Sequence, residues 1–170
     1  MTTTLTREAR DLLETLETHR RFLRRTVQGL TDIQLGLRTS VSELCLGGIL
    51  KHVTAVERSW TRFVVEGPSA IPPFDEAAYV EHRAQFAVGP DDTVASLLAD
   101  YEDVARATAE LVAELPDLDA DHPMPEAPWF EPGTRWSARR VLLHVLAETA
   151  QHAGHADIIR EGIDGAKTMG

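Results

Sequence analysis

The sequence predicts an all-α fold in which two long connections join four main helices. In four stretches apolar residues recur at spacings of three and four, as they do on the buried face of a helix. Glycine and proline gather where these stretches end, and no stretch shows a convincing strand pattern. The chain has 170 residues, of which 43% are hydrophobic, so we expect one domain over residues 1–170.

The first helix is predicted over residues 4–28, and Gly29 ends it. Residues 32–35 are expected to form a short turn. Ser40 or Ser42 is expected to cap the second helix, because Glu43 follows Ser40 at the spacing of a capping box.

The second helix is predicted to end at Gly67. Residues 67–90 then form a long connection, with a short helix around residues 76–85. The third long helix is predicted to begin at Asp91 or Asp92.

Pro116 is predicted to close that helix, and residues 116–134 form a second connection rich in proline and aspartate. Loops of this length often cover functional sites. Trp60 and the Trp129-Phe130 segment are candidates for the wall of such a site, although aromatic residues more commonly serve packing alone.

The last helix, predicted over residues 136–165, carries the main functional pattern. At about 100° per residue, His144, Glu148, His152 and His155 lie within a sector of roughly 80°, together with aliphatic residues. A face of this kind must point inward, where an unpaired carboxylate is costly. A divalent cation would satisfy the carboxylate and the imidazoles together.

His52 is the expected contribution from a second helix, since it shares an apolar face with Ile49, Val53 and Val56. Bundles build metal sites from inward side chains on facing helices. Two histidines and one carboxylate leave a coordination position open, as in catalytic sites. Geometry alone does not decide between His144 and Glu148 as a ligand, and each histidine alone would be an ordinary core residue.

The remaining candidates are weaker. His19, His82 and His122 stand in charged or loop settings and are not expected to be ligands, and Cys45 is expected to be a small core residue. A single cysteine and the absence of a signal-peptide pattern favour a cytoplasmic protein. The net charge of −10 disfavours nucleic acid or an anionic membrane as a partner.

Two motifs carry a resemblance to a known family. The segment Leu46-Gly-Gly-Ile-Leu-Lys-His52 and the later Glu148-x3-His152 resemble the DinB-like metalloprotein superfamily. Within it they are similar to the actinobacterial branch that contains mycothiol-dependent maleylpyruvate isomerase and mycothiol S-transferases. This resemblance implies a four-helix bundle of the DinB type, a homodimer, and His52, Glu148 and His152 as metal ligands.

The resemblance also favours one chemistry, in which a metal-bound low-molecular-weight thiol such as mycothiol attacks an electrophilic small molecule in detoxification. Zinc is the first choice of metal, with nickel, iron or manganese as alternatives. His155 is the candidate catalytic residue; it and His144 are expected to orient Glu148 or to carry a proton. A hydrolase that uses metal-bound hydroxide and a bundle that metal merely stabilises remain alternatives.

Overall fold

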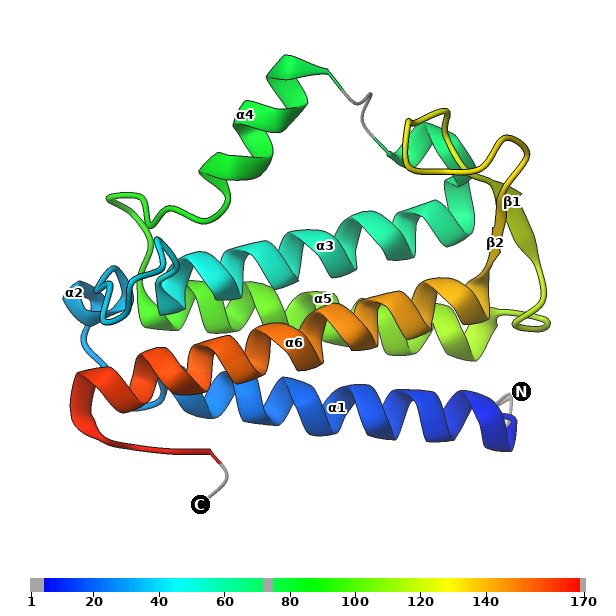
Figure 1. The fold of residues 1–170 in the computed structure, drawn as a ribbon. Helices are drawn as coiled ribbons and strands as arrows, with labels where there is room; N and C mark the ends of the chain where they lie inside the picture. The colour runs from blue at the N-terminus through cyan, green and yellow to red at the C-terminus, as the bar shows by residue number, and fades with distance from the viewer. Residues whose placement is uncertain (1–4, 72–74, 169–170) are drawn as a thin grey trace.

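The computed structural model of the chain describes residues 5–71 and 75–168. Its frame is a bundle of four long helices (Figure 1), which confirms the all-α prediction. These helices are α1 (Arg7–Val27), α3 (Leu46–Glu66), α5 (Val94–Glu114) and α6 (Ala138–Asp164). In the described part of the chain, none of the helices combines the length and the apolar composition that a membrane span requires.

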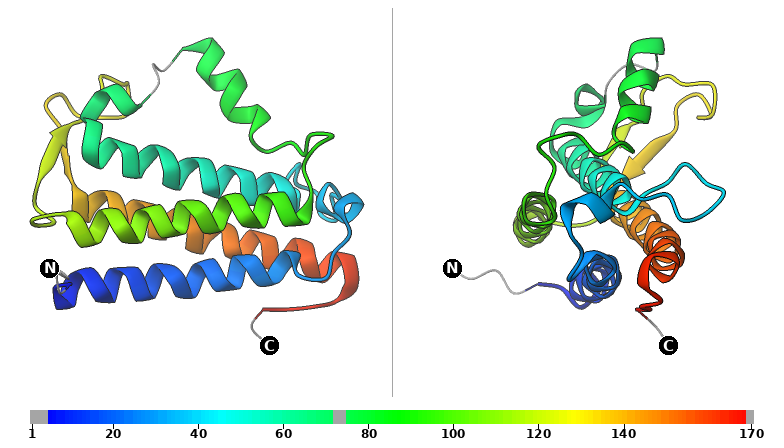
Figure 2. Two further views of the ribbon diagram at one scale, coloured as in Figure 1. Left: turned by 180° about the vertical axis from the view of Figure 1, so that it is seen from behind. Right: turned by 90° about the vertical axis from the view of Figure 1, so that its left-hand side faces the viewer.

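The helices pack in the order α3, α5, α1, α6 around the bundle, as the end view shows (Figure 2). α3 and α5 run in one direction, whereas α1 and α6 run in the other (Figure 1). Because α3 and α5 are parallel, the chain between them must travel back along about 30 Å of bundle. This return carries the short 3-10 helix η1 (Gly67–Ala70) and α4 (Glu76–Ala84), and α4 stands away from the bundle above α3 (Figure 1).

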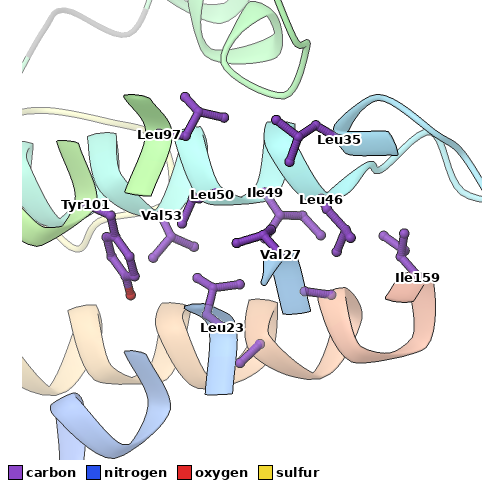
Figure 3. Packing of buried hydrophobic residues seen from close by; sticks show 12 residues of the cluster. Leu23, Val27, Leu35, Leu46, Ile49, Leu50, Val53, Leu97, Tyr101 and Ile159 are labelled. Carbon is purple, nitrogen blue, oxygen red and sulfur yellow. The ribbon is translucent and has the colours of Figure 1, made fainter. Parts of the chain in front are cut away.

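The core lies between the helices, where all four long helices contribute aliphatic side chains and α5 adds the ring of Tyr101 (Figure 3). Burial of these side chains is the main favourable contribution to the fold. The residues labelled in Figure 3 are Leu23, Val27, Leu35, Leu46, Ile49, Leu50, Val53, Leu97, Tyr101 and Ile159. Leu35 comes from the single-turn helix α2 (Asp32–Leu35), which occupies the predicted turn.

The predicted cap of the second helix is wrong. α3 begins at Leu46 with Cys45 as its N-cap. The hydroxyl oxygens of Ser40 and Ser42 accept hydrogen bonds from backbone N–H groups two residues later, at 3.2 Å in both cases. These serines therefore stabilise bends in the preceding loop, a use of serine that competes with capping.

The third long helix also begins later than predicted, at Val94 instead of Asp91 or Asp92. Thr93 is the N-cap of α5, and its hydroxyl accepts a hydrogen bond from the N–H of Ser96 at 3.0 Å. Asp92 is used elsewhere, since its carboxylate accepts from Nζ of Lys51 at 2.7 Å and from the N–H of Gly89 at 2.6 Å. Asp92 thereby joins the end of the return segment to α3.

Two short strands contradict the expectation of no strands. β1 (Asp121–Pro123) pairs antiparallel with β2 (Arg135–Ser137), so that His122 lies opposite Trp136. Trp136 therefore precedes α6, and Ser137 caps that helix by accepting from the N–H of Arg140 at 3.2 Å. The hairpin holds the loop of residues 124–134 at the end of the bundle where α3 ends (Figure 1).

Candidate metal centre

His52, Glu148 and His152 converge between α3 and α6. Nε2 of His52 lies 3.7 Å from Oε2 of Glu148, and Nε2 of His152 lies 3.6 Å from the same oxygen. The centroids of the two imidazole rings are 4.9 Å apart. His52 is buried, and the other two side chains are half-buried.

The two helices bring these groups together for simple reasons. Glu148 and His152 are four residues apart on α6 and so lie one turn apart on the same face. His52 lies on the face of α3 that packs against α6. His52 on α3 therefore faces Glu148 and His152 on α6, as the sequence predicts.

The three groups fit a divalent cation. Distances of 3.6 and 3.7 Å between nitrogen and oxygen are too long for direct hydrogen bonds. They are close to the spacing of roughly 3.4 Å that tetrahedral geometry gives two ligands each about 2.1 Å from one zinc ion. One ligand atom from each of the three residues lies within 4.8 Å of the other two, and among the described residues no other set of three or more meets this test.

The ionisation states also suit a metal. The imidazole of His52 is the main influence that lowers the pKa of the Glu148 carboxyl, while burial opposes it. Burial, with His52 as a further cause, lowers the pKa of His152 to about 4. At neutral pH the site therefore offers a charged carboxylate and a neutral imidazole, the forms that bind metal ions.

Ring packing holds the two imidazoles in place. The ring of Phe86 stacks on His52 with centroids 4.1 Å apart and an angle of 24° between the planes. His155 lies edge-on to His152 at 5.4 Å. Among the described residues, Nδ1 of His52 and Nδ1 of His152 find no hydrogen-bond partner. Contacts with Phe86 and His155 thus limit how these two rings can turn.

Two glycines allow Phe86 to reach His52. A Cβ atom on Gly48 would lie 2.0 Å from the carbonyl oxygen of Phe86, and one on Gly47 would lie 2.6 Å from Cγ2 of Val88. The Nζ of Lys51 donates a hydrogen bond to the carbonyl of Ala87 at 2.9 Å, which fixes the same segment. The Gly-Gly-x-x-Lys-His pattern in the sequence therefore serves the close approach of residues 86–88 to α3.

The three candidate ligands open onto a cavity of about 860 Å³. α3 forms its floor together with α6, the end of α4 and the residues just after it form one wall, and Trp129 and Phe130 form another. Trp60 and the Trp129-Phe130 segment therefore line the cavity, as expected. A small molecule in this space can reach the point where the three side chains converge.

His144 and His155 occupy different places around this centre. His144 lines the cavity one turn before Glu148, edge-on to Trp60 at 4.9 Å, and is not part of the converging group. Burial lowers the pKa of His144. His155 lies beside His152 and is not among the residues that line the cavity. The catalytic role expected of His155 remains a prediction.

His82 is not part of the converging group, but it is a cavity residue that the sequence did not indicate. It lies on α4, lines the cavity and stands edge-on to His52 with ring centroids 5.3 Å apart. Burial, together with the proximity of His52, lowers its pKa. No helical pattern could have indicated this position, because it depends on how the return segment folds back over α3.

Other candidates lie away from the centre. His122 interacts with the carbonyl of Val64 at 3.1 Å, and the sulfur of Cys45 lies 3.8 Å from the carbonyl oxygen of Phe86. Arg135 pairs with Asp121, and Arg139 pairs with Glu8 and Asp119. Neither arginine is among the residues that line the cavity.

Two comparisons with known proteins give different results. A comparison with curated proteins finds no match to this chain. A family model described as Mycothiol-S-transferase matches residues 11–165, which include His52, both members of the α6 pair and the glycines before His52. The chain therefore belongs to the mycothiol S-transferase family.

Proposed function

We propose that the protein joins a low-molecular-weight thiol, mycothiol or a close analogue, to an electrophilic small molecule, with a divalent cation, zinc as first choice, held by His52, Glu148 and His152. The observation that carries the proposal is the convergence of these three side chains at the floor of the cavity. A cation in this position supplies a Lewis-acidic coordination site at which a thiol loses its proton near neutral pH.

The chain itself contributes binding, orientation and a destination for the proton. The cavity holds both reactants within reach of each other, which replaces an encounter in solution. The thiolate sulfur forms a bond to the electrophilic carbon, and no protein nucleophile is required. The family to which the chain belongs favours this reaction over hydrolysis.

Two histidines are placed to take the proton of the thiol. His144 lines the cavity on the α6 side and His82 lines it on the α4 side. Burial lowers the pKa of both, so that both are neutral at pH 7 and can accept a proton at a ring nitrogen. His155, which packs on His152, is proposed as a positioning residue that acts through this ligand.

The test of this function starts from chelator-treated protein that is reloaded with zinc. Conjugation of mycothiol to acrylamide is measured with and without metal, and the metal content is determined by elemental analysis. We expect turnover that requires both metal and thiol, and we expect His52→Ala to lose both the metal and the turnover. His19→Ala is the matched control, because His19 packs on Phe22 of α1, outside the cavity.

The same assay decides which residue of α6 is the third ligand. We expect Glu148→Gln to lower the metal content and His144→Gln to leave it unchanged, since His144 lies outside the converging group. Zinc-dependent hydrolysis without any thiol would instead support the hydrolase alternative. Metal that raises thermal stability while no thiol is consumed would support a purely structural ion.

A further inference from the structure

The two sides of α3 give the cavity two different surfaces. Angles around the axis of α3 are measured from His52. Val56 lies about 40° and Trp60 about 80° from it on the side that faces α6. On the opposite side, Arg62 lies about 80° and Arg58 about 120° from it. All four residues line the cavity. One side is therefore apolar. The other is polar, because there Arg58 pairs with Asp100 and Arg62 pairs with Glu66.

The apolar side is an aromatic wall built around Trp60. One face of Trp60 stacks on Trp136 with centroids 4.9 Å apart and planes at 20°. Its edges contact Phe63 at 5.6 Å and His144 at 4.9 Å. These neighbours fix the indole ring, yet Trp60 stays half-buried and faces the cavity.

The wall continues across the cavity into the loop of residues 124–134. Phe130 lies edge-on to Trp136 at 5.8 Å and lines the cavity, as do Ile71 and the 63% exposed side chain of Trp129. An apolar ligand group that covers this surface would bind favourably, since each buried Å² of apolar area contributes about 25 cal/mol. Ligand cavities are typically lined in this way, with few polar groups.

Trp60 follows His52 by eight residues and therefore lies about 12 Å further along α3. A molecule that reaches both must be elongated. A polar reactant meets the opposite side, where Ser59 and the ion-paired Arg58 and Arg62 line the cavity and offer O–H and N–H groups.

From this division we propose that the acceptor is an elongated electrophile with a planar apolar group, which binds against Trp60 while its reacting carbon lies at the centre formed by His52, Glu148 and His152. This proposal rests on the proposed function, because it gives a binding site to the electrophile that the thiol attacks in that reaction. Trp60 is thus a specificity-determining residue that acts on acceptor binding.

Two acrylamides test the assignment. In each, the thiolate sulfur bonds to the terminal alkene carbon and a proton adds to the carbon beside the carbonyl, so no group leaves. The protein should prefer N-(3-phenylpropyl)acrylamide to N-methylacrylamide in kcat/KM, after correction for the uncatalysed rates. Trp60→Leu should reduce this preference about 10-fold, mainly through KM and with unchanged zinc content. Trp60→Phe should restore most of the preference.

Tyr79→Leu is the matched control, because Tyr79 is an exposed aromatic residue of α4 that does not line the cavity. It should leave the preference unchanged. A preference that is the same in folded Trp60→Leu as in the unaltered protein would overturn the proposal and leave the proposed function standing.

A binding measurement tests the acceptor site at Trp60 separately from the proposed transferase function. N-(3-phenylpropyl)propionamide cannot react, and its binding to metal-free protein is measured by calorimetry. Binding that weakens about 10-fold in Trp60→Leu would support the site even if no acrylamide is turned over. Absence of binding to the folded, unaltered protein would overturn it.

Discussion

At the scale of single residues, His152 couples the site to the stability of the metal-free protein. Burial is the largest cause that lowers its pKa to about 4, from 6.5, and the neighbouring His52 and His155 act in the same direction. Below pH 6.5 the unfolded chain takes up a proton that the folded chain does not. The contribution of the neutral imidazole to stability is therefore fully present above pH 6.5 and is lost as the pH falls towards 4.

We predict that the free energy of unfolding of metal-free protein falls as the pH is lowered from 7 to 4, by up to about 3 kcal/mol through His152. Urea denaturation in the presence of chelator measures the effect. His152→Gln should flatten this pH dependence, whereas His19→Ala should not. A pH dependence that is unchanged in His152→Gln would contradict the prediction.

The residues of the candidate site could largely be predicted from the sequence. Glu148 and His152 share one face by spacing alone, and His52 stands among aliphatic residues on a second helix. His82 could not be predicted in the same way, because α4 is short and its exposed side chains carry no periodic signal. Its proximity to His52 follows from long-range packing, which spacing within one helix does not contain.

At the scale of elements, the segment of residues 86–88 is the support on which the orientation of His52 depends. A side chain on Gly48 would collide with backbone atoms of Phe86, which cannot rotate away. We predict that Gly48→Ala displaces this segment, releases the ring stacked on His52 and weakens zinc binding about 10-fold. Overpacking should also cost about 1–3 kcal/mol of stability. Competition with a chelating dye and urea denaturation measure the two effects.

Gly154→Ala is the control for that prediction. Gly154 lies within α6, and a Cβ atom there would meet nothing within 4 Å. The substitution should leave zinc affinity unchanged and should stabilise the protein by about 0.5–1 kcal/mol, because alanine favours the helix. If Gly48→Ala and Gly154→Ala changed the zinc affinity equally, close packing at Gly48 would not be needed for zinc binding.

The ends of elements were harder to predict than the elements themselves. The serines at 40 and 42 match a capping pattern, but their side chains bond to the loop backbone, and the helix starts later at Leu46. The strands β1 and β2 have three residues each and pair across the intervening loop. Segments this short show no alternation that a sequence pattern could reveal.

At the scale of the whole molecule, the direction of the helices creates the cavity. Because α3 and α5 are parallel, the return segment must pass over α3 (Figure 1). Two of its residues, His82 and Phe86, line the cavity and contact the ring of His52. A simple antiparallel bundle with short loops would leave this face of α3 open. The long connections that the sequence predicts are thus the parts that enclose the site.

A buried ion pair joins three helices on another side of α3. Glu57 lies five residues after His52, about 140° round the helix, and is fully buried. The guanidinium of Arg20 on α1 donates two hydrogen bonds to its carboxylate, and the hydroxyl of Thr108 on α5 donates another. The network therefore fixes α3 relative to α1 and α5, and its members lie outside the cavity lining.

Removal of one partner should be costly, because the other charge stays buried without compensation. We predict that Arg20→Met lowers the free energy of unfolding by about 3–5 kcal/mol. The double variant Arg20→Met/Glu57→Leu should recover much of this loss, since apolar side chains can replace a buried ion pair. Arg21→Met, at the exposed neighbour, should change stability by less than about 0.5 kcal/mol. Urea denaturation of the unaltered protein, Arg20→Met, Glu57→Leu and the double variant gives the coupling between the two charges. Zinc content should stay unchanged wherever the protein is folded. A cost at Arg20 no larger than the cost at Arg21 would mean that this network does not hold the three helices together.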